Sequence, residues 1–294
     1  MQKTIILLLS LITALFLTGP VVEEHRDSVR IEHKELKMPQ GTWRYLTTNK
    51  GEKAILFLHG ASSSKNIWKN QYPIAIEGYK NIFVDLLGYG ESDKPESGYN
   101  LVNWIEGIHS ILENEKVDKV CIVAHSNGVI FAKEFYRNYP GKILKLILLD
   151  GGLKQMISDP MLAWMKSSLE RSDFEVFMKN NIDAMQTEGL GEQDADLLKR
   201  DALNIPKGVT AAEFELVSDP ATWEEVIIKC PVTVVHSNNP IWDESYVAWL
   251  ENVAPDHQLI QWNDSGHFMP LQYPARLNKL ITERVLKTEG NSKN

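Results

Sequence analysis

The chain has 294 residues, of which 43% are hydrophobic and 24% charged, and its formal net charge at pH 7 is −8. This composition is that of an ordinary soluble globular protein, long enough for one large domain or a domain with an insertion. The acidic balance, with no basic stripe, argues against nucleic acid as a partner. The sequence contains no cluster of metal ligands, no Walker loop and no dinucleotide-binding fingerprint, so we expect neither a metal nor a cofactor.

The first twenty residues have the character of a targeting segment. Lys3 precedes an uncharged apolar run from Ile5 to Leu17, and Gly19-Pro20 ends it. About a dozen apolar residues suit the core of a signal peptide and fall short of the roughly 20 that span a bilayer. We interpret residues 1–20 as a signal peptide, with an uncleaved N-terminal membrane anchor as the alternative. A secreted or extracytoplasmic protein is therefore expected, attached to a membrane only through residues 5–17, if at all.

Strand and helix patterns alternate along most of the chain. Val29–Leu36 and Trp43–Thr47 predict two strands that form an antiparallel edge. Continuous apolar runs, as in buried parallel strands, follow at 54–58, 81–85, 119–124, 145–150, 232–236 and 258–262. Helical patterns lie at 101–112, 129–139, 243–252 and from Pro274 onward. This alternation predicts a mostly parallel sheet flanked by helices, with right-handed crossovers.

The alternation breaks between Leu153 and Ile228. This stretch contains no buried strand pattern, and its helical patches are Met161–Leu169, Phe174–Met185 and Ala195–Leu203. It is too long for a loop in a compact domain, so we interpret residues 153–228 as a helical cap over a core formed by 29–152 and 229–288. The tryptophans and methionines of the cap suggest a substrate with a hydrophobic portion.

The stretch around Ser126 predicts a nucleophile. A buried strand ends at Ala124, and a helical pattern begins at Gly128. Small residues at these two positions are what a sharp strand-to-helix turn needs, because the two backbones pass too close for larger side chains. In such a nucleophile elbow the serine hydroxyl stands exposed above the sheet.

A serine hydroxyl is a weak nucleophile and needs a general base, normally a histidine oriented by a carboxylate, together with N–H donors for the oxyanion. The candidate base is His267, because it lies in a polar, glycine-containing loop after the last strand and can reach the elbow. The candidate oxyanion donors are the main-chain N–H groups of Asn127 and of Ala61, which lies in the loop after the 54–58 strand. Three further histidines at strand ends are interpreted as buried structural imidazoles: His59, His125 and His236.

Two aspartates preserve the chain order Ser…Asp…His that such sites use. Asp150 closes the strand after the elbow helix, and Asp243 follows the next strand beyond the cap. Asp243 stands near the start of a helix, where N-capping is a sufficient explanation for it. Asp150 is therefore favoured and Asp243 is the alternative acid, with Asn239 as a neutral third possibility.

Four motifs, in this order and spacing, resemble those of the α/β-hydrolase superfamily over about residues 29–287. They are His59-Gly60-Ala61, Asp85-Leu86-Leu87-Gly88-Tyr89-Gly90-Glu91-Ser92, Ala124-His125-Ser126-Asn127-Gly128 and Ser265-Gly266-His267. Within that superfamily the chain is similar to the capped group of esterases, haloalkane dehalogenases, epoxide hydrolases and cofactor-free haloperoxidases.

Two positions in the motifs refine what this resemblance implies. Ala124 replaces the first glycine of the elbow and is still small. Ser126 stands where dehalogenases and epoxide hydrolases carry Asp, which disfavours those two activities. Dehalogenase-like relatives place their acid after the strand equivalent to 145–149, which supports Asp150.

The residues and the resemblance together predict an α/β-hydrolase fold with a helical cap. They also predict a serine hydrolase that cleaves a carboxylic ester, thioester or lactone through an acyl-enzyme, with a small-molecule acyl substrate that is partly hydrophobic. The alternative is a ligand-binding or signalling protein that keeps the fold and turns over little or nothing.

Overall fold

The computed structural model of the protein describes residues 29–184 and 189–287. The segment interpreted as a signal peptide or anchor, residues 1–20, lies outside these ranges, so export remains a prediction. Within the described ranges, no helix is both long and apolar enough to cross a membrane.

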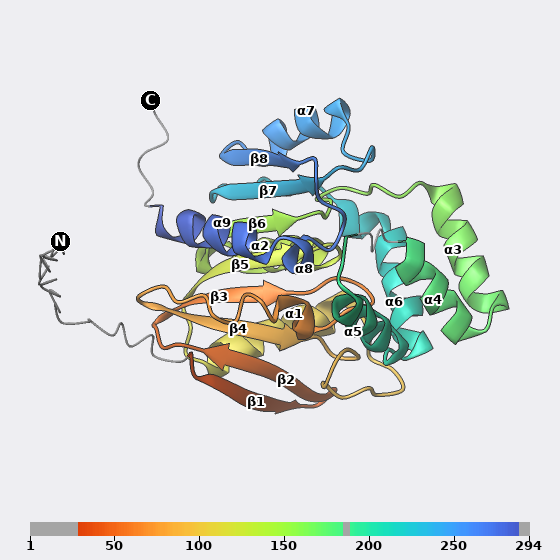
Figure 1. Cartoon of the computed structure of the whole chain (residues 1–294), viewed down its shortest axis with the longest axis horizontal. Helices are drawn as coiled ribbons and strands as arrows, with labels where there is room; N and C mark the ends of the chain where they lie inside the picture. Colours follow the sequence, from red (N-terminus) through yellow and green to blue (C-terminus); the bar gives the residue numbers. More distant parts are fainter. Residues whose placement is uncertain (1–28, 185–188, 288–294) are drawn as a thin grey trace, which may run out of the picture.

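A single sheet organises the described part of the chain, with its eight strands in the order β1-β2-β4-β3-β5-β6-β7-β8 (Figure 1). The strands are β1 (Ile31–Met38), β2 (Gly41–Thr48), β3 (Lys53–Leu58), β4 (Tyr79–Asp85), β5 (Lys119–His125), β6 (Ile143–Leu149), β7 (Val232–Ser237) and β8 (His257–Trp262). The β1–β2 and β2–β4 pairs are antiparallel and all the others are parallel. Every predicted strand falls on one of these, with its ends displaced by two residues at most. The predicted antiparallel edge is also confirmed.

Helices cover both faces of the sheet, which is why the interiors of the central strands are continuous apolar runs, such as Ala54–Leu58 in β3. In β3, Leu56 and Leu58 face one hydrophobic cluster, while Ile55 and Phe57 face another. The first cluster lies under α1 (Leu101–Asn114), α2 (Gly128–Asn138) and α7 (Glu244–Val253). The second lies under α9 (Pro274–Leu286), α8 (Met269–Gln272) and the short 3₁₀ helix η1 (Lys65–Trp68). Because successive side chains of a strand point to opposite faces, burial on both faces needs this unbroken apolar pattern.

The chain between β6 and β7 is helical in its described part. Its α-helices are α3 (Asp159–Arg171), α4 (Phe174–Ala184), α5 (Glu192–Leu203) and α6 (Lys207–Ser218), and the 3₁₀ helix η3 (Pro220–Trp223) follows them. We call α3–α6 the helical insert. Figure 1 shows it gathered at one end of the sheet. The three predicted helical patches fall on α3, α4 and α5, whereas α6 was not predicted.

Polar contacts join the insert to the core. The Asp201 carboxylate in α5 accepts a hydrogen bond from the Ser64 hydroxyl at 2.5 Å, and the Asn204 amide donates to Gly90 O at 3.1 Å. At the other side Lys133, a 2% exposed residue of α2, donates to the carbonyls of Leu153 and Thr222. Lys133 therefore ties the start and the end of the segment between β6 and β7 to the same core helix.

Candidate active site

Ser126 occupies the turn between β5 and α2 in a backbone conformation that few residues adopt. Its φ is +54°, in the left-handed region that costs a non-glycine residue about 1–3 kcal/mol. Close packing of the neighbouring main chain fixes the conformation of this turn. A Cβ added at Gly128 would lie 2.6 Å from Leu58 O, and one added at Gly60 would lie 2.6 Å from the Ser126 Cβ. The loop after β3 is therefore packed directly against the serine.

Asp150 and His267, far apart in the chain, meet in this structure. The His267 Nδ1 atom lies 2.7 Å from Asp150 Oδ2. The other carboxylate oxygen, Oδ1, accepts hydrogen bonds from the Ser237 N–H and the Trp242 indole N–H, both at 2.8 Å. Burial would raise the pKa of Asp150, but the hydrogen bonds from His267 and Ser237 outweigh it and lower this pKa to about 2. Asp150 is thus a carboxylate at neutral pH, with its orientation fixed by three donors.

The two alternatives to Asp150 have other partners. Asp243 caps α7, accepting hydrogen bonds from the Tyr246 N–H at 2.9 Å and the Ser245 hydroxyl at 2.7 Å. The Asn239 side chain accepts from the Ile241 N–H at 3.1 Å. Among the described residues, neither is hydrogen-bonded to His267.

Ser126 and His267 line the same pocket, which has a volume of about 180 Å³. Within the described chain the Ser126 hydroxyl makes no hydrogen bond, and the structure does not join it to His267. Such bonds are often long without substrate and tighten in the reacting complex. Asp150, Asn127, Asn239 and Lys154 also line the pocket, and its apolar wall consists of Ile130, Met156, Ile157, Val217, Trp223, Ile241 and Trp242.

The His125 side chain positions His267 by contacting the main-chain carbonyl of His267. The His125 Nε2 atom lies 2.7 Å from the His267 carbonyl oxygen, and the two ring centroids are 4.7 Å apart. Burial lowers the pKa of His125 to about 3, and the nearby His267 acts in the same direction. A neutral His125 whose Nε2–H donates to that carbonyl fits both observations.

His59 positions the loop that carries Ala61. Its Nδ1 lies 2.8 Å from Gly60 O, and its Nε2 accepts a hydrogen bond from the Leu86 N–H at 3.2 Å. Burial lowers the pKa of His59, and because Nε2 accepts the Leu86 N–H, the proton of the ring is on Nδ1. Because Gly60 O is held by His59, the Ala61 N–H of the same trans peptide points the opposite way.

A third buried histidine packs against one of the donors to Asp150. The His236 ring stacks on Trp242, with centroids 3.9 Å apart and planes 9° from parallel. Trp242 is the indole that donates to Asp150, so His236 fixes the plane of that donor. Sequence reasoning missed Trp242 and Ser237 as supporting residues. From this loop the sequence indicated only Asn239, as a neutral third possibility for the acid.

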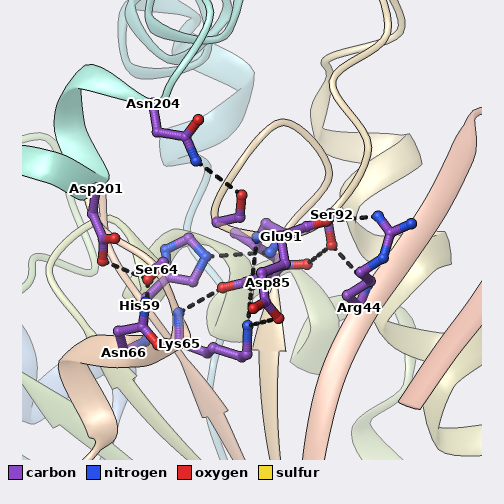
Figure 2. Close-up of polar contacts among 12 residues, drawn as sticks. Arg44, His59, Ser64, Lys65, Asn66, Asp85, Glu91, Ser92, Asp201 and Asn204 are labelled. Atoms are coloured by element: carbon purple, nitrogen blue, oxygen red, sulfur yellow. Dashed lines mark hydrogen bonds and ion pairs between the residues drawn. The ribbon is translucent and has the colours of Figure 1, made fainter. Parts of the chain in front are cut away.

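A buried ion pair stabilises the loops beside His59 (Figure 2). The Lys65 ammonium lies 2.5 Å from Asp85 Oδ2, with the two side chains 3% and 0% exposed. Burial alone would lower the pKa of Lys65, but Asp85 and Glu91 outweigh it and raise this pKa, so the lysine is charged. The Asp85 carboxylate also accepts from the N–H groups of Lys65 and Glu91, which ties the loop after β3 to the loop after β4.

We expect Lys65→Met to destabilise the protein strongly, because it leaves the Asp85 carboxylate buried without its cation. Breaking a buried pair in this way costs about 3–5 kcal/mol of the free energy of unfolding. In a chain of 294 residues that corresponds to a fall in Tm of roughly 5–8 °C, measurable by thermal unfolding. Glu91→Gln is the matched control, because the Glu91 side chain is 60% exposed and its pair with Lys65 should contribute at most about 1 kcal/mol. Equal Tm shifts in the two variants would contradict this assignment.

Comparisons with known proteins agree with this architecture. A family model described as "Alpha/beta hydrolase family" matches residues 55–280. The chain is similar to protein ABHD8 of Homo sapiens, with 30% identity over 276 residues that cover 82% of this chain and 57% of that protein. It is also similar to a haloalkane dehalogenase of Mesorhizobium japonicum, with 24% identity over 246 residues, covering 84% and 74% of the two chains.

Among solved structures, an esterase from Exiguobacterium antarcticum superposes with a TM-score of 0.73 at 17% identity. The match covers 87% of this chain and 100% of that one. The sheet order, the elbow between β5 and α2 and the family match all point the same way, and the chain belongs to the α/β-hydrolase family.

Proposed function

We propose that the protein is a serine hydrolase that cleaves a carboxylic ester, thioester or lactone through an acyl-enzyme. The observation that carries the proposal is the 2.7 Å contact between Asp150 and His267 in the pocket that Ser126 also lines. In this proposal Ser126 attacks the carbonyl carbon while His267 takes its proton and passes it to the leaving group. Asp150 orients the imidazole, and the N–H groups of Ala61 and Asn127 bind the oxyanion. Water, activated by the same imidazole, then releases the acid.

A serine at this position favours acyl transfer over displacement at saturated carbon. Attack by Ser126 on an alkyl halide or an epoxide would form an alkyl ether, which water activated by an imidazole does not cleave. Attack on a carbonyl forms an ester, which it does cleave. The likeness to a haloalkane dehalogenase therefore supports a hydrolytic activity for this chain but not dehalogenation.

The pocket suggests a small acyl group. Its volume of about 180 Å³ is below the range of roughly 300–1,000 Å³ typical of pockets for drug-sized ligands. Val217 in α6 and Trp223 in η3 contribute to its wall, which supports a role for the helical insert as a cap over Ser126. We propose a small-molecule ester or lactone whose acyl or alcohol portion is apolar.

A fluorophosphonate probe tests the proposal most directly. We expect one covalent label per chain, located at Ser126 by peptide mass spectrometry, and turnover of p-nitrophenyl esters that is fastest for short acyl chains. A folded sample that takes up no label and hydrolyses no ester of the series would overturn the proposal in favour of a ligand-binding protein with this fold.

A further inference from the structure

Glu213 is a buried carboxyl that the proposed mechanism does not use. It lies in α6 of the helical insert and is 4% exposed. Its Oε1 accepts a hydrogen bond from the side-chain amide of Asn127 at 3.4 Å. Two residues further along, Glu215 pairs with Lys166 on the exposed side of α6. A carboxyl buried without a cation is costly unless it stays neutral or serves a purpose.

Tyr89, in the loop after β4, is another neighbour of the Glu213 carboxyl. Its side chain is 0% exposed, and its hydroxyl makes no hydrogen bond of standard geometry within the described residues. Burial, and after it the charge of Glu213, raise the pKa of Tyr89 well above its usual value. An unpaired buried hydroxyl beside a carboxyl is a contact that a small shift of α6 would complete.

Through Asn127 and Tyr89, Glu213 is connected to both of the proposed oxyanion donors. Asn127 supplies one main-chain donor, and Glu213 binds its side chain directly. The ring of Tyr89 packs at 4.9 Å on that of His59, which holds the Gly60 carbonyl before the second donor, Ala61. One turn further along α6, Val217 lines the pocket. The insert thus contacts the substrate side and the oxyanion side of the site through one helix.

We propose that Glu213 is a positioning residue through which the helical insert aligns the oxyanion hole, by binding the Asn127 side chain and packing on Tyr89. The inference rests on the proposed function and deepens it, because it makes the placement of α6 a condition for fast acyl transfer.

The charge state of Glu213 gives this coupling a pH dependence. Burial raises the pKa of Glu213 to about 7, while contacts with Tyr89 and Asn127 act in the opposite direction. The other titratable groups around Tyr89 are Tyr99 and His59, and burial keeps His59 neutral. Above about pH 7 the buried carboxyl ionises, and no cationic side chain of the described residues forms an ion pair with it, so the contact between α6 and the elbow should loosen.

The test compares three variants in full-length protein. Glu213→Leu removes the hydrogen bond, Glu213→Gln keeps a neutral acceptor of the same shape, and Glu215→Gln changes the exposed face of the same helix. We expect Glu213→Leu to lower kcat and the rate of fluorophosphonate labelling roughly tenfold with a smaller change in KM, which is less than the roughly 10²–10³ for loss of a whole oxyanion donor. Glu213→Gln should return kcat to within about threefold of wild type and remove the fall in kcat that we expect for wild type, relative to this variant, as the pH rises through 7. Glu215→Gln should match wild type.

Stability measurements test the contact independently of activity. Because the native state holds the Glu213 proton up to about pH 7 and an ordinary glutamic acid loses it near 4.5, wild type should lose stability relative to Glu213→Gln across that interval. The Asn127→Ala and Glu213→Leu changes should also be non-additive in the free energy of unfolding.

Two sets of results would contradict the role proposed for Glu213 or the function on which it rests. Wild-type kcat and an unchanged pH profile in Glu213→Leu, or equal losses in the Leu and Gln variants, would overturn the positioning role. An unlabelled wild type would overturn the proposed function, and additive effects in the stability cycle would then overturn the coupling as well.

Discussion

Ser126→Ala is expected to abolish ester turnover and covalent labelling while leaving the fold intact. The substitution removes the only atom that would bond to the acyl group in the proposed mechanism. In an enzyme whose serine, histidine and aspartate act as a unit, loss of the nucleophile costs about 10⁶ in kcat. Alanine keeps the Cβ of serine and removes only Oγ, so it adds no atom to the tightly packed turn at φ +54°. Steady-state kinetics and probe labelling measure the loss, and thermal unfolding checks the fold.

Ser62→Ala is the matched control for this experiment. Ser62 lies in the neighbouring loop, is 3% exposed and has a φ of +56°, so its truncation tests the same kind of backbone without touching the proposed nucleophile. We expect its kcat to stay within a few-fold of wild type. If Ser126→Ala kept more than about a hundredth of the wild-type kcat, the acyl-enzyme mechanism would be wrong, because even the loss of one oxyanion donor costs about 10²–10³ in kcat and the loss of the nucleophile must cost more.

The sheet could be predicted from the sequence because its strands are buried on both faces. A strand such as β3 then needs a continuous apolar run, here Ala54–Leu58, and this pattern is visible without any knowledge of its neighbours. The edge strands β1 and β2 are separated only by Pro39 and Gln40, and a proline followed closely by a glycine is typical of a tight turn between two antiparallel strands. What the sequence could not indicate was how the strands lie side by side, because that order depends on contacts between distant segments.

The helix α6 was missed for a reason that bears on function. Its core-facing positions include Thr210 and Glu213, which are 3% and 4% exposed, so the apolar periodicity that marks an amphipathic helix is broken there. Gly208 near its start weakens the helical pattern further. The residue that hides this helix in the sequence is the one that contacts the nucleophile elbow.

The nucleophile and the base could be proposed from local motifs, but the acid could not be settled in that way. Asp150 and Asp243 both preserve the chain order, and only the arrangement of β6, β7 and the loop after β8 brings one of them to His267. The indole of Trp242 lies 92 positions from Asp150 in the chain. No local sequence pattern predicts that a tryptophan so distant in the chain will donate a hydrogen bond to Asp150.

Asp150→Asn is expected to lower kcat about 10⁴-fold with little change in the fold. The reason lies in the three donors around the carboxylate. Ser237 N–H and Trp242 N–H both point at Oδ1, so only the oxygen of an asparagine side chain can stand there. Its NH₂ group must then face His267 Nδ1, where it stabilises the tautomer with the proton on Nε2. In this tautomer Nε2 already carries a proton, so it has no lone pair with which to accept the proton of Ser126.

Asp243→Asn separates this effect from a general loss of charge. Asp243 caps α7 from an exposed position, and asparagine is as good an N-cap as aspartate, so both kcat and Tm should stay close to wild type. Steady-state kinetics of the two variants on one ester, together with the fluorophosphonate labelling rate, measure the contrast. A large loss in Asp243→Asn with a small one in Asp150→Asn would mean that the loop after β7 rearranges during catalysis and delivers a different acid. The pairing of Asp150 with His267 would then belong to a resting state only.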